Sequence, residues 1–527
     1  MKISLFWRKM LLVLLSILLL SLGWLGATGL TLLVALVPLL WISSTAEDSR
    51  QGWWSTFGWA LLTFVGWNLS TIWWIGFATP IGPVAATVAS SFYSMLAFML
   101  FHTVSKRAPK ALAYTVLVSV WIALEYNYTV SDFSWPWLLL GNGFSNDIWA
   151  IQWYEYTGIF GGSLWVLLSN ILFFEAFASR SRAKYIATSV AIVAPLVLSL
   201  VIFFTYDEGD GERVTATVIQ PNVDCYEKFS GEGKAQEDNL VDLLEQVDDS
   251  VDLVLMPETA IPTKMWLETV HFSPVFNRFG NTVKEKEIYD TSLIFGISSI
   301  VRYKRDKFDD LRVMATPDTF DYEVFNTAYR YSKNDGIDYR HKAKLVIGVE
   351  NTPSWIFKVF RFFVIDLGGV VGQLGKGDNT RPFDFQGDKK VGTAICYEGL
   401  YGDFYGGFVR DSAQVMAIIS NDGWWGDTPG HRHLYSLSKV RAVEHRRAIA
   451  RSANTGVSGF IDARGVSLDE MGWGERGLLT HDLVLNSKLT VYTRWGDYIA
   501  RIMVFVALLS LLYFVAYRVR RRHHLVE

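Results

Sequence analysis

The sequence is poor in cysteine and in charge, and both shortages restrict the class of protein. Only two cysteines, Cys225 and Cys396, occur among 527 residues, which excludes a disulfide framework. Charged residues make up 19% of the chain, below the roughly 25% of soluble domains, and this indicates a membrane protein. The shortage is local, because residues 1–205 and 499–517 are apolar while residues 206–498 have the charge density of a soluble domain.

Patterns for binding nucleic acid, nucleotides and metals are also missing. The net charge is −3 and there is no basic stripe with interleaved aromatic residues, which argues against nucleic acid. The "GEGK" stretch at 231–234 lacks the spacing and the preceding strand of a phosphate-binding loop, and no metal-ligand spacing occurs. We therefore expect no cofactor, no metal and no nucleic acid partner.

Long apolar segments are present instead, each close to the roughly 20 residues that cross a bilayer core. We predict about eight spans, at 8–24, 26–42, 57–77, 84–104, 111–127, 161–178, 185–204 and 499–517. Basic residues gather at 2–9, 106–110, 180–184 and 518–522, whereas loops 78–83 and 128–160 have none. Because basic loops are usually cytoplasmic, we expect both termini inside and the domain between the last two spans outside the cytoplasm.

Residues 206–498 alternate between predicted strands and helices, which indicates an α/β domain with a mixed sheet covered by helices. We predict helices at 234–249 and 433–451, a hairpin at 457–466, and strands at 213–223, 251–259, 292–301, 324–332, 389–398 and 413–422. Catalytic groups in such folds usually lie at strand ends. Glu258, Cys396 and Asn421 stand at three of these ends.

Cys396 is a candidate nucleophile that needs a base, because a free thiol is mostly protonated at neutral pH. Glu258 follows the apolar stretch "LVLMP", where desolvation can raise its pKa until it accepts the proton. Acyl transfer also needs a cation or backbone N–H groups beside the carbonyl oxygen, and Lys342 and Lys344 are candidates. The alternative for the thiol is a structural disulfide with Cys225.

Seven motifs stand in one order along the chain: "VIQPNVDCYEKF", "MPETAIP", "HKAKLVIGVE", "ICYE", "SNDGWWGD", "RAVEHRRAIARSANTGVSGFIDARG" and "TVYTRWGD". With these motifs the chain resembles the apolipoprotein N-acyltransferases, a membrane branch of the nitrilase (carbon–nitrogen hydrolase) superfamily. The resemblance covers almost the whole chain. It implies a multi-pass α-helical membrane domain of about eight spans and a four-layer α-β-β-α nitrilase-like sandwich. The expected domains are 1–205, 206–498 and 499–527.

The resemblance also implies a Glu–Lys–Cys triad on Glu258, Lys342 and Cys396. Lys342, rather than Lys344, stands three places before Leu-Val, as the family's lysine does. The implied supporting residues, which fall within the same motifs, are Glu350, Glu398, Tyr397 and Asn421.

Two positions depart from the family pattern. Ile347-Gly348-Val349 replaces the usual Pro-x-Gly before Glu350, and Arg340 stands where Tyr is common. Glu398 would share a side of the chain with Cys396 if the chain stayed extended. It would then orient Lys342 or a substrate amine, or else act as a structural carboxylate that accepts backbone N–H bonds.

By resemblance, the function is transfer of a fatty acyl chain from a membrane phospholipid, through a cysteine thioester, to the amine of the diacylglyceryl-cysteine of an apolipoprotein. The expected location is the bacterial inner membrane, with the catalytic domain periplasmic and the chain monomeric. The apolar stretches 353–365 and 261–272 are candidate arms that dip into lipid, and a buried core helix is the alternative for the first.

Two other functions remain open on the sequence. A membrane-tethered amidase would use the same triad with water as acceptor. A transporter would need ionisable residues at mid-membrane, whereas Glu125 and Glu175 lie toward span ends. The charged segment 441–447 is expected to pair along its helix and pack it on the sheet, with phosphate or lipoprotein binding as the alternative.

Overall fold

The computed structural model describes residues 4–132, 134–209, 211–229, 233–304, 314–315, 320–351 and 373–523. The chain forms two compact units, one made of Met1–Tyr206 with Trp495–Glu527 and the other of Asp207–Arg494. The predicted assignment of the chain to a membrane domain, an external domain and a cytoplasmic tail stays a prediction.

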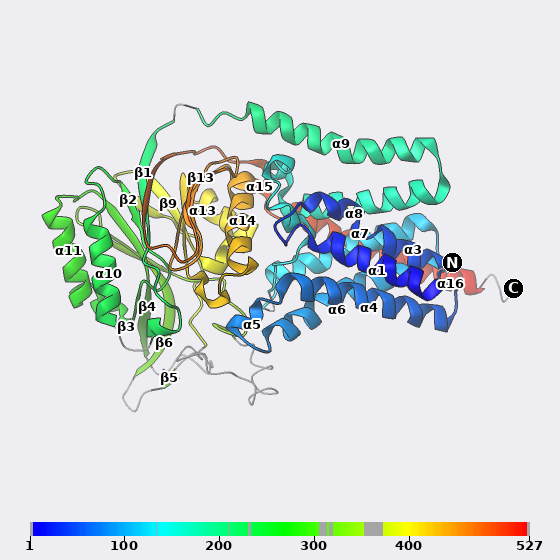
Figure 1. Ribbon diagram of the computed structural model, residues 1–527, viewed down its shortest axis with the longest axis horizontal. Coiled ribbons are helices and arrows are strands. Elements are labelled where there is room, and N and C mark those ends of the chain that lie inside the picture. Colours follow the sequence, from blue (N-terminus) through cyan, green and yellow to red (C-terminus); the bar gives the residue numbers. More distant parts are fainter. Residues whose placement is uncertain are drawn as a thin grey trace. The chain divides into compact units, whose positions relative to one another are not determined.

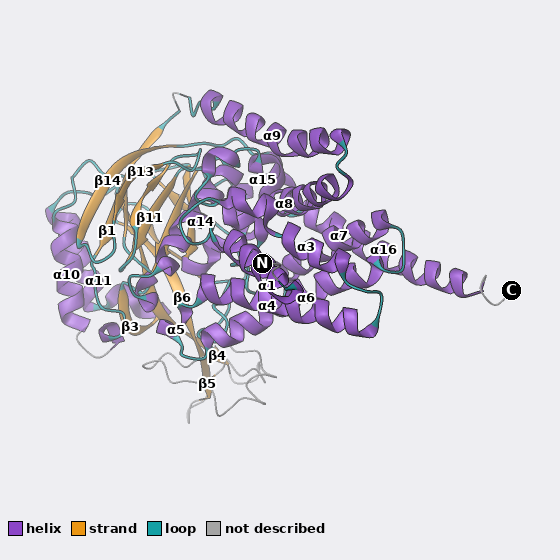
Figure 2. Ribbon diagram, turned by 45° about the vertical axis from the view of Figure 1, so that its right-hand side comes forward, coloured by secondary structure: helices purple, strands orange, loops and turns teal. Residues whose placement is uncertain are grey.

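The first unit is helical (Figure 2). Two of its segments are interrupted: 29–45 holds η1, α2 and α3, and short 3-10 turns η2 and η3 precede α8. Its elements are α1 (Leu5–Ser21), η1 (Gly29–Thr31), α2 (Leu32–Ala35), α3 (Val37–Thr45), α4 (Arg50–Ile72), α5 (Ile75–Ala78), α6 (Gly82–Ser105), α7 (Lys110–Val130), η2 (Leu140–Phe144), η3 (Ile148–Ala150), α8 (Tyr154–Ser179), α9 (Arg182–Thr205) and α16 (Tyr498–His523).

A side chain accounts for the break between α2 and α3. The Asn170 amide accepts a bond from Leu36 N (2.7 Å) and donates one to Leu32 O (2.7 Å). In a continuous helix these two backbone groups would bond each other, so the inserted amide satisfies both and lets the helix bend. The predicted second span, 26–42, is therefore a broken helix.

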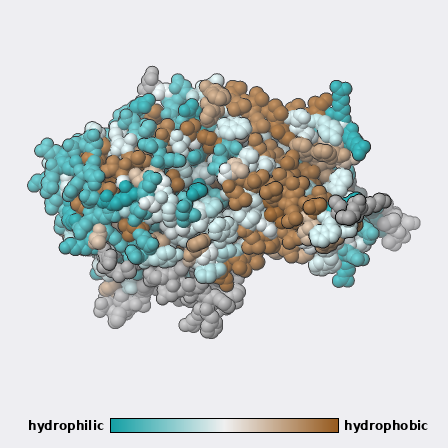
Figure 3. Space-filling view, in the orientation of Figure 1, coloured by the Kyte–Doolittle hydropathy of each residue, from teal (hydrophilic) through white to brown (hydrophobic). Residues whose placement is uncertain are grey.

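Several helices of this unit expose apolar side chains rather than polar ones. In the most apolar 18-residue stretch of each helix, only 11% is buried in α9 and 17% in α16. Figure 3 shows brown, hydrophobic surface over the helices of this unit. An apolar surface of this extent requires an apolar solvent. Among the described helices, α6, α8, α9 and α16 are long and apolar enough to cross a membrane, and the count of eight spans stays a prediction.

The second unit contains two sheets that pack face to face through β1 and β11. The eight-stranded sheet has the order β14-β1-β2-β4-β6-β5, with β3 on β4 and β7 on β6, and the six-stranded sheet runs β13-β12-β11-β10-β9-β8. The strands are β1 (Arg213–Gln220), β2 (Leu253–Leu255), β3 (Ile261–Trp266), β4 (Ser292–Lys304), β5 (Met314–Ala315), β6 (Phe320–Ser332), β7 (Gly336–His341), β8 (Phe383–Phe385), β9 (Lys389–Ile395), β10 (Val415–Ser420), β11 (Ile449–Ala453), β12 (Ser458–Ile461), β13 (Ser467–Met471) and β14 (Gly477–Val484).

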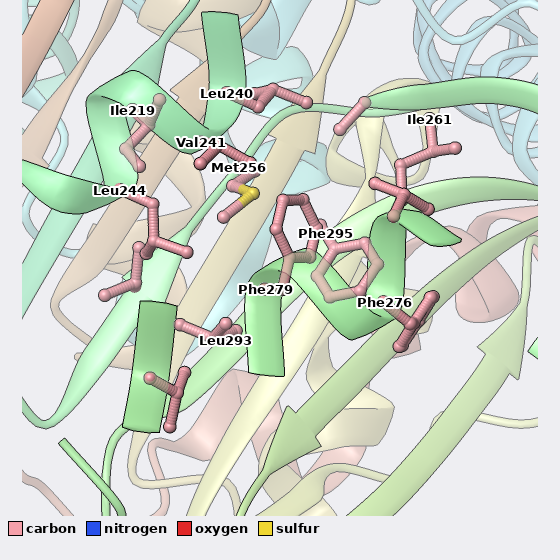
Figure 4. Packing of buried hydrophobic residues seen from close by; sticks show 14 of the residues in the cluster. Ile219, Leu240, Val241, Leu244, Met256, Ile261, Phe276, Phe279, Leu293 and Phe295 are labelled. Carbon is pink, nitrogen blue, oxygen red and sulfur yellow. The ribbon is translucent and has the colours of Figure 1, made fainter. Parts of the chain in front are cut away.

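Helices cover the outer face of each sheet. Helices α10 (Gly233–Glu245) and α11 (Pro274–Glu285) lie side by side on the larger sheet (Figure 1), and α13 (Gly402–Arg410) and α14 (Pro429–His445) cover the smaller one. Figure 4 shows Leu240 and Leu244 of α10, Phe276 and Phe279 of α11 and Phe295 of β4 in one cluster of buried hydrophobic residues. This is the predicted four-layer α-β-β-α sandwich, in which each sheet buries both faces.

A predicted helix contains a strand in its last part. The segment predicted as a helix at 433–451 is helical only to His445, and residues 449–453 form strand β11, buried throughout. Arg446 at the helix end has φ +49°, a left-handed conformation that ends a helix. A run of apolar and charged residues continues across this point, so periodicity alone could not mark it.

Candidate active site

The two sheets bring their strand ends to one place between them. From the larger sheet come Glu258, just after β2, and Lys342, just after β7. From the smaller sheet comes Cys396, the first residue after β9. All three side chains are buried, so their interactions act in a medium of low polarity.

The ammonium of Lys342 holds two carboxylates. Its Nζ lies 2.8 Å from Oε1 of Glu258 and 2.9 Å from Oε1 of Glu350. Burial lowers the pKa of Lys342, but these carboxylates and the Cys396 thiol outweigh it and raise the pKa well above its usual value. Lys342 is therefore a fixed cation in this site. Lys344 instead lies over the ring of Tyr401, 4.8 Å from its centroid.

Asn326 on β6 joins the two carboxylates from the other side. Its Nδ2 donates to Oε1 of Glu258 (2.6 Å) and to Oε1 of Glu350 (3.1 Å). Oε2 of Glu350 accepts the backbone N–H of Val346 (2.9 Å). Among the described residues, no donor reaches Oε2 of Glu258, so this oxygen is the one able to receive a proton.

The nucleophile candidate stands on a strained turn. Cys396 has φ +50°, a left-handed conformation that costs a non-glycine residue about 1–3 kcal/mol. The chain turns there from β9 into the 3-10 helix η6 (Cys396–Leu400). The turn fixes where the sulfur lies, and both cysteines are free thiols, so the disulfide alternative is wrong.

The surroundings of Cys396 keep it protonated at rest. Burial raises the pKa of the thiol well above its usual value, the negative charge of Glu258 raises it further, and Lys342 and a hydrogen bond from Ser420 lower it. Transfer of the thiol proton to Glu258 removes the opposing charge and leaves the lysine cation facing the sulfur. The arrangement is therefore suited to a transfer of the thiol proton to the glutamate.

Glu398 does not share a side with the thiol, because the chain is not extended after Cys396. Its two oxygens accept a bidentate pair from Arg340 (2.6 and 2.8 Å) and the backbone N–H groups of Ile395 and Ala343 (2.8 and 2.6 Å). Burial alone would raise the pKa of Glu398, but these bonds hold it below its usual value. Of the two roles predicted for Glu398, the structural carboxylate is the one that its contacts fit. Its ion-pair partner is Arg340, a residue that departs from the family pattern.

The altered loop before Glu350 is compatible with its place in the site. Gly348 has φ +82°, which glycine adopts without strain, and its N–H donates to Asn351 O (2.9 Å). The turn brings Glu350 within reach of Lys342. The turn therefore forms in this chain without the proline of the family pattern.

A second buried cation was missed by sequence reasoning. Lys228, on η4 (Glu227–Phe229), is 2% exposed and donates to the backbone oxygen of Glu258 (3.0 Å). Burial lowers its pKa to about 8, although the charge of Glu258 opposes this. The bond anchors a tight turn, since Thr259 has φ +46° and a Cβ on Gly296 would lie 2.2 Å from Thr259 N.

The remaining predicted residues lie in or around the site. Tyr397 is buried in η6, with its ring 5.5 Å from that of Tyr401. Asn421 is buried after β10, and its Oδ1 accepts Nδ2 of Asn454 (3.1 Å). The predicted arm at 353–365 lies outside the described residues, whereas 261–272 forms β3 and η5 (Leu267–Phe272) and exposes Phe272.

The charged segment after the active-site strands has a structural position. Arg441 forms an ion pair with Glu444 along α14, with Nε 3.2 Å from Oε2, as predicted. The prediction that Arg447 pairs along the helix is wrong, because α14 ends at His445. Arg447 lies beyond the helix, and its guanidinium donates to the backbone oxygens of Ala413 and Lys488 (2.8 and 2.9 Å). Both arginines are buried, so this segment holds the helix to the sheet.

Comparisons with known proteins agree with this architecture. The family model described as "Carbon-nitrogen hydrolase" matches residues 215–488, and that described as "Apolipoprotein N-acyltransferase N-terminal domain" matches residues 11–172. An apolipoprotein N-acyltransferase of Chlorobaculum tepidum is 28% identical over 90% of each chain, and one of Geobacter metallireducens is 26% identical over 93% of this chain and 92% of its own.

Solved structures match part of the chain at lower similarity. A CN-hydrolase superfamily protein from Xanthomonas campestris is 14% identical, with a TM-score of 0.35 over 56% of this chain and 97% of its own. An amidase of the nitrilase superfamily from Nesterenkonia is 13% identical, with a TM-score of 0.37 over 55% and 97%.

Proposed function

The chain belongs to the carbon–nitrogen hydrolase family, in its apolipoprotein N-acyltransferase branch, and from this premise we propose how its buried triad performs acyl transfer. The enzyme transfers a fatty acyl chain from a membrane phospholipid to the amine of the diacylglyceryl-cysteine of an apolipoprotein. The observation that carries the mechanism is the contact of Lys342 with Glu258 beside the Cys396 thiol.

In the first step Glu258 takes the thiol proton on Oε2, and the sulfur attacks the ester carbonyl carbon of the phospholipid. Lys342, with backbone N–H groups, stabilises the oxyanion. The ester C–O bond breaks, the lysophospholipid oxygen takes the proton from Glu258, and an acyl thioester remains on Cys396. Glu350 and Asn326 position Lys342 and Glu258 through the hydrogen bonds described above.

In the second step the free amine of the acceptor attacks the thioester carbonyl. Its proton passes to Glu258 as the C–N bond forms and the C–S bond breaks, and the departing sulfur recovers that proton. The same glutamate therefore acts as base and acid in both halves of the reaction. Since neither half has a net gain of protons, the enzyme returns to its starting state.

Location and partners extend the proposal. We place the chain in the bacterial inner membrane with the catalytic unit on the periplasmic side, because basic residues gather in alternate loops. The chain acts as a monomer, and its partners are a phospholipid donor and a diacylglyceryl-modified apolipoprotein. The amidase alternative has less support, since the curated relatives over nine-tenths of the chain are acyltransferases.

The test is to incubate the purified full-length protein with phospholipid vesicles and follow its intact mass. We expect an added acyl mass that hydroxylamine removes and that a diacylglyceryl lipopeptide discharges as its N-acyl product. Cys396→Ser should give no hydroxylamine-sensitive adduct. Absence of any adduct on the native chain, or discharge only to free fatty acid, would overturn the acyltransferase proposal.

A further inference from the structure

A buried hydroxyl group that the catalytic mechanism does not use ends the strand next to the one that carries the nucleophile. Strands β9 and β10 are parallel neighbours, and Ile395 pairs with Ile419. The next residues along these two strands are Cys396 and Ser420. Both are buried, and Ser420 has no exposed surface. The register of the two strands therefore brings the hydroxyl group of Ser420 to the thiol of Cys396.

A fixed carboxylate accepts the proton of this hydroxyl group. Oγ of Ser420 lies 2.5 Å from Oδ1 of Asp422, the first residue of η7 (Asp422–Trp425). Both oxygens of Asp422 accept from Nη2 of Arg451 on β11 (3.1 and 2.9 Å). A Cβ on Gly456 would lie 2.6 Å from Oδ2 of Asp422, so the backbone leaves this carboxylate little room. Asp422 is therefore an acceptor that is held in place.

Two groups compete for the single proton of the hydroxyl group. Ser420 can donate it to Asp422 or to the sulfur of Cys396, because a serine side chain has only one O–H donor. The sulfur of a thiol is a weak acceptor, so at rest the proton is directed to the carboxylate. A thiolate is a charged acceptor, and hydrogen bonds to charged groups are the stronger ones. Loss of the thiol proton to Glu258 therefore favours a turn of the hydroxyl group toward the sulfur.

The charges that face the sulfur agree with this competition. Burial and the charge of Glu258 raise the pKa of the Cys396 thiol most strongly, and the charge of Asp422 raises it further. Lys342 and the hydrogen bond of Ser420 lower it. After Glu258 has taken the proton, Asp422 is a negative charge that still opposes the thiolate, so a donor that turns from Asp422 to the sulfur favours ionisation.

We propose that Ser420 is a further catalytic residue, whose hydroxyl group donates to the thiolate of Cys396 when it forms and again when the thioester breaks. The O–H bond of the serine stays intact, because only its hydrogen bond changes partner, and the thiol proton still passes to Glu258. Asp422 and Arg451 are positioning residues that hold the hydroxyl group at the sulfur. The inference rests on the proposed role of Cys396 as the nucleophile.

The test measures the reactivity of the thiol without the lipid reaction. Full-length native enzyme and Ser420→Ala are treated with iodoacetamide over a range of pH, and peptide mass spectrometry follows Cys396 separately from the other free thiol, Cys225. In Ser420→Ala we expect alkylation and thioester formation to slow together by about 10- to 100-fold, the effect of one lost hydrogen bond to a charged group. The alkylation profile should also move to higher pH, which a loss of packing does not cause.

The matched control is Ser452→Ala. Ser452 is fully buried on the neighbouring strand β11, and its Oγ donates to Ile219 O (2.7 Å). Both variants therefore lose one buried hydrogen bond of a serine in the same sheet, and their unfolding temperatures should fall by similar amounts. Ser452→Ala should keep native rates of alkylation and thioester formation, because its hydroxyl group is bonded elsewhere.

Asp422→Asn tests the proposal with the opposite sign. The amide oxygen can still accept from Arg451 or Ser420, but the negative charge near the sulfur is gone and the serine proton is held less strongly. Alkylation of Cys396 should therefore become about tenfold faster, whereas damage to the fold around the thiol would not produce a faster reaction at the same pH with an unshifted unfolding temperature.

Four results would overturn the proposal. Native rates in Ser420→Ala would leave the hydroxyl group without a catalytic role, and equal slowing in Ser452→Ala would assign the loss to structure. Slower thioester formation with native alkylation would mean that Ser420 acts on the lipid and not on the sulfur. If Ser420→Ala does not fold, slower or unchanged alkylation in folded Asp422→Asn contradicts the proposal. Failure of acyl transfer itself looks different, since the native enzyme would form no acyl adduct while its alkylation still responded to these substitutions.

Discussion

Two buried ionic clusters begin at the same strand end and serve different purposes. Arg340 and Lys342 stand two residues apart at the end of β7, and each meets glutamate. In the Arg340–Glu398 cluster both carboxylate oxygens are used by fixed donors. In the Lys342 cluster Oε2 of Glu258 has no donor among the described residues, so one acceptor stays available for a proton. A cluster whose carboxylate oxygens are all hydrogen-bonded can only stabilise the fold, whereas a cluster with a free carboxylate oxygen can also accept a proton.

The comparison predicts its largest effect at Glu258. Glu258→Gln keeps the volume and the hydrogen bonds to Lys342 and Asn326 but cannot take the thiol proton. Thioester formation should fall about 10³- to 10⁴-fold, within the upper range of general-base effects, while the unfolding temperature stays close to that of the native enzyme. Single-turnover intact-mass kinetics measure the rate. A loss below tenfold would show that another group is the base.

The next largest effect is on stability rather than chemistry. Arg340→Met leaves the Glu398 carboxylate buried without its partner, which should lower the free energy of unfolding by about 3–5 kcal/mol. Arg340→Met/Glu398→Gln should recover part of that loss, since no charge then remains buried and the amide oxygen can still accept from a backbone N–H group. Thermal unfolding in detergent measures both. If the double variant is less stable than the single one, the pair does more than neutralise buried charge.

Glu350→Gln should have a smaller effect on activity than Glu258→Gln. Both oxygens of Glu350 are occupied, by Lys342 and Asn326 on Oε1 and by Val346 N on Oε2, so it positions the cation and moves no proton. We expect about a 10- to 100-fold loss of thioester formation, the size of a disturbed positioning contact. Its pH profile should keep the native shape. A shifted acidic limb would instead make Glu350 a proton carrier.

The smallest predicted effect is a shift in pH dependence caused by Lys228. Burial lowers the pKa of this lysine to about 8, so its positive charge beside Glu258 is present below pH 8 and is lost above it. The native rate of thioester formation should therefore decline as pH rises through about 8. Lys228→Arg, which stays charged, should move that decline to higher pH, and Lys228→Met should remove it and lower the rate about tenfold. Identical profiles for the three proteins would exclude this role.

Local sequence features gave much of the fold and part of the site. The two predicted strands that lead to the site are present but shorter than predicted, because β9 ends at Ile395 rather than 398 and β2 at Leu255 rather than 259. Lys342 was separable from Lys344 only by resemblance, and the structure places it on Glu258. Only one sequence feature pointed weakly to Asn326, which is a polar residue inside the predicted strand "VFNTAYRYS". Lys228 lies within the motif "VIQPNVDCYEKF", but nothing in that motif predicts its burial, because a lone lysine in a polar stretch is usually solvated.

The sequence by itself determined where the chain is apolar, where strands and helices alternate, and which residue types at strand ends are candidates for nucleophile, base and cation. These properties are local, since they depend on residue type and on spacing along one segment. Only the tertiary structure decided that Glu398 forms an ion pair with Arg340 and that Asn326 and Lys228 donate hydrogen bonds to Glu258. It also decided that Glu125 lines a cavity. Each of these contacts joins segments well separated along the chain, and burial sets its strength, so neither composition nor periodicity could reveal it.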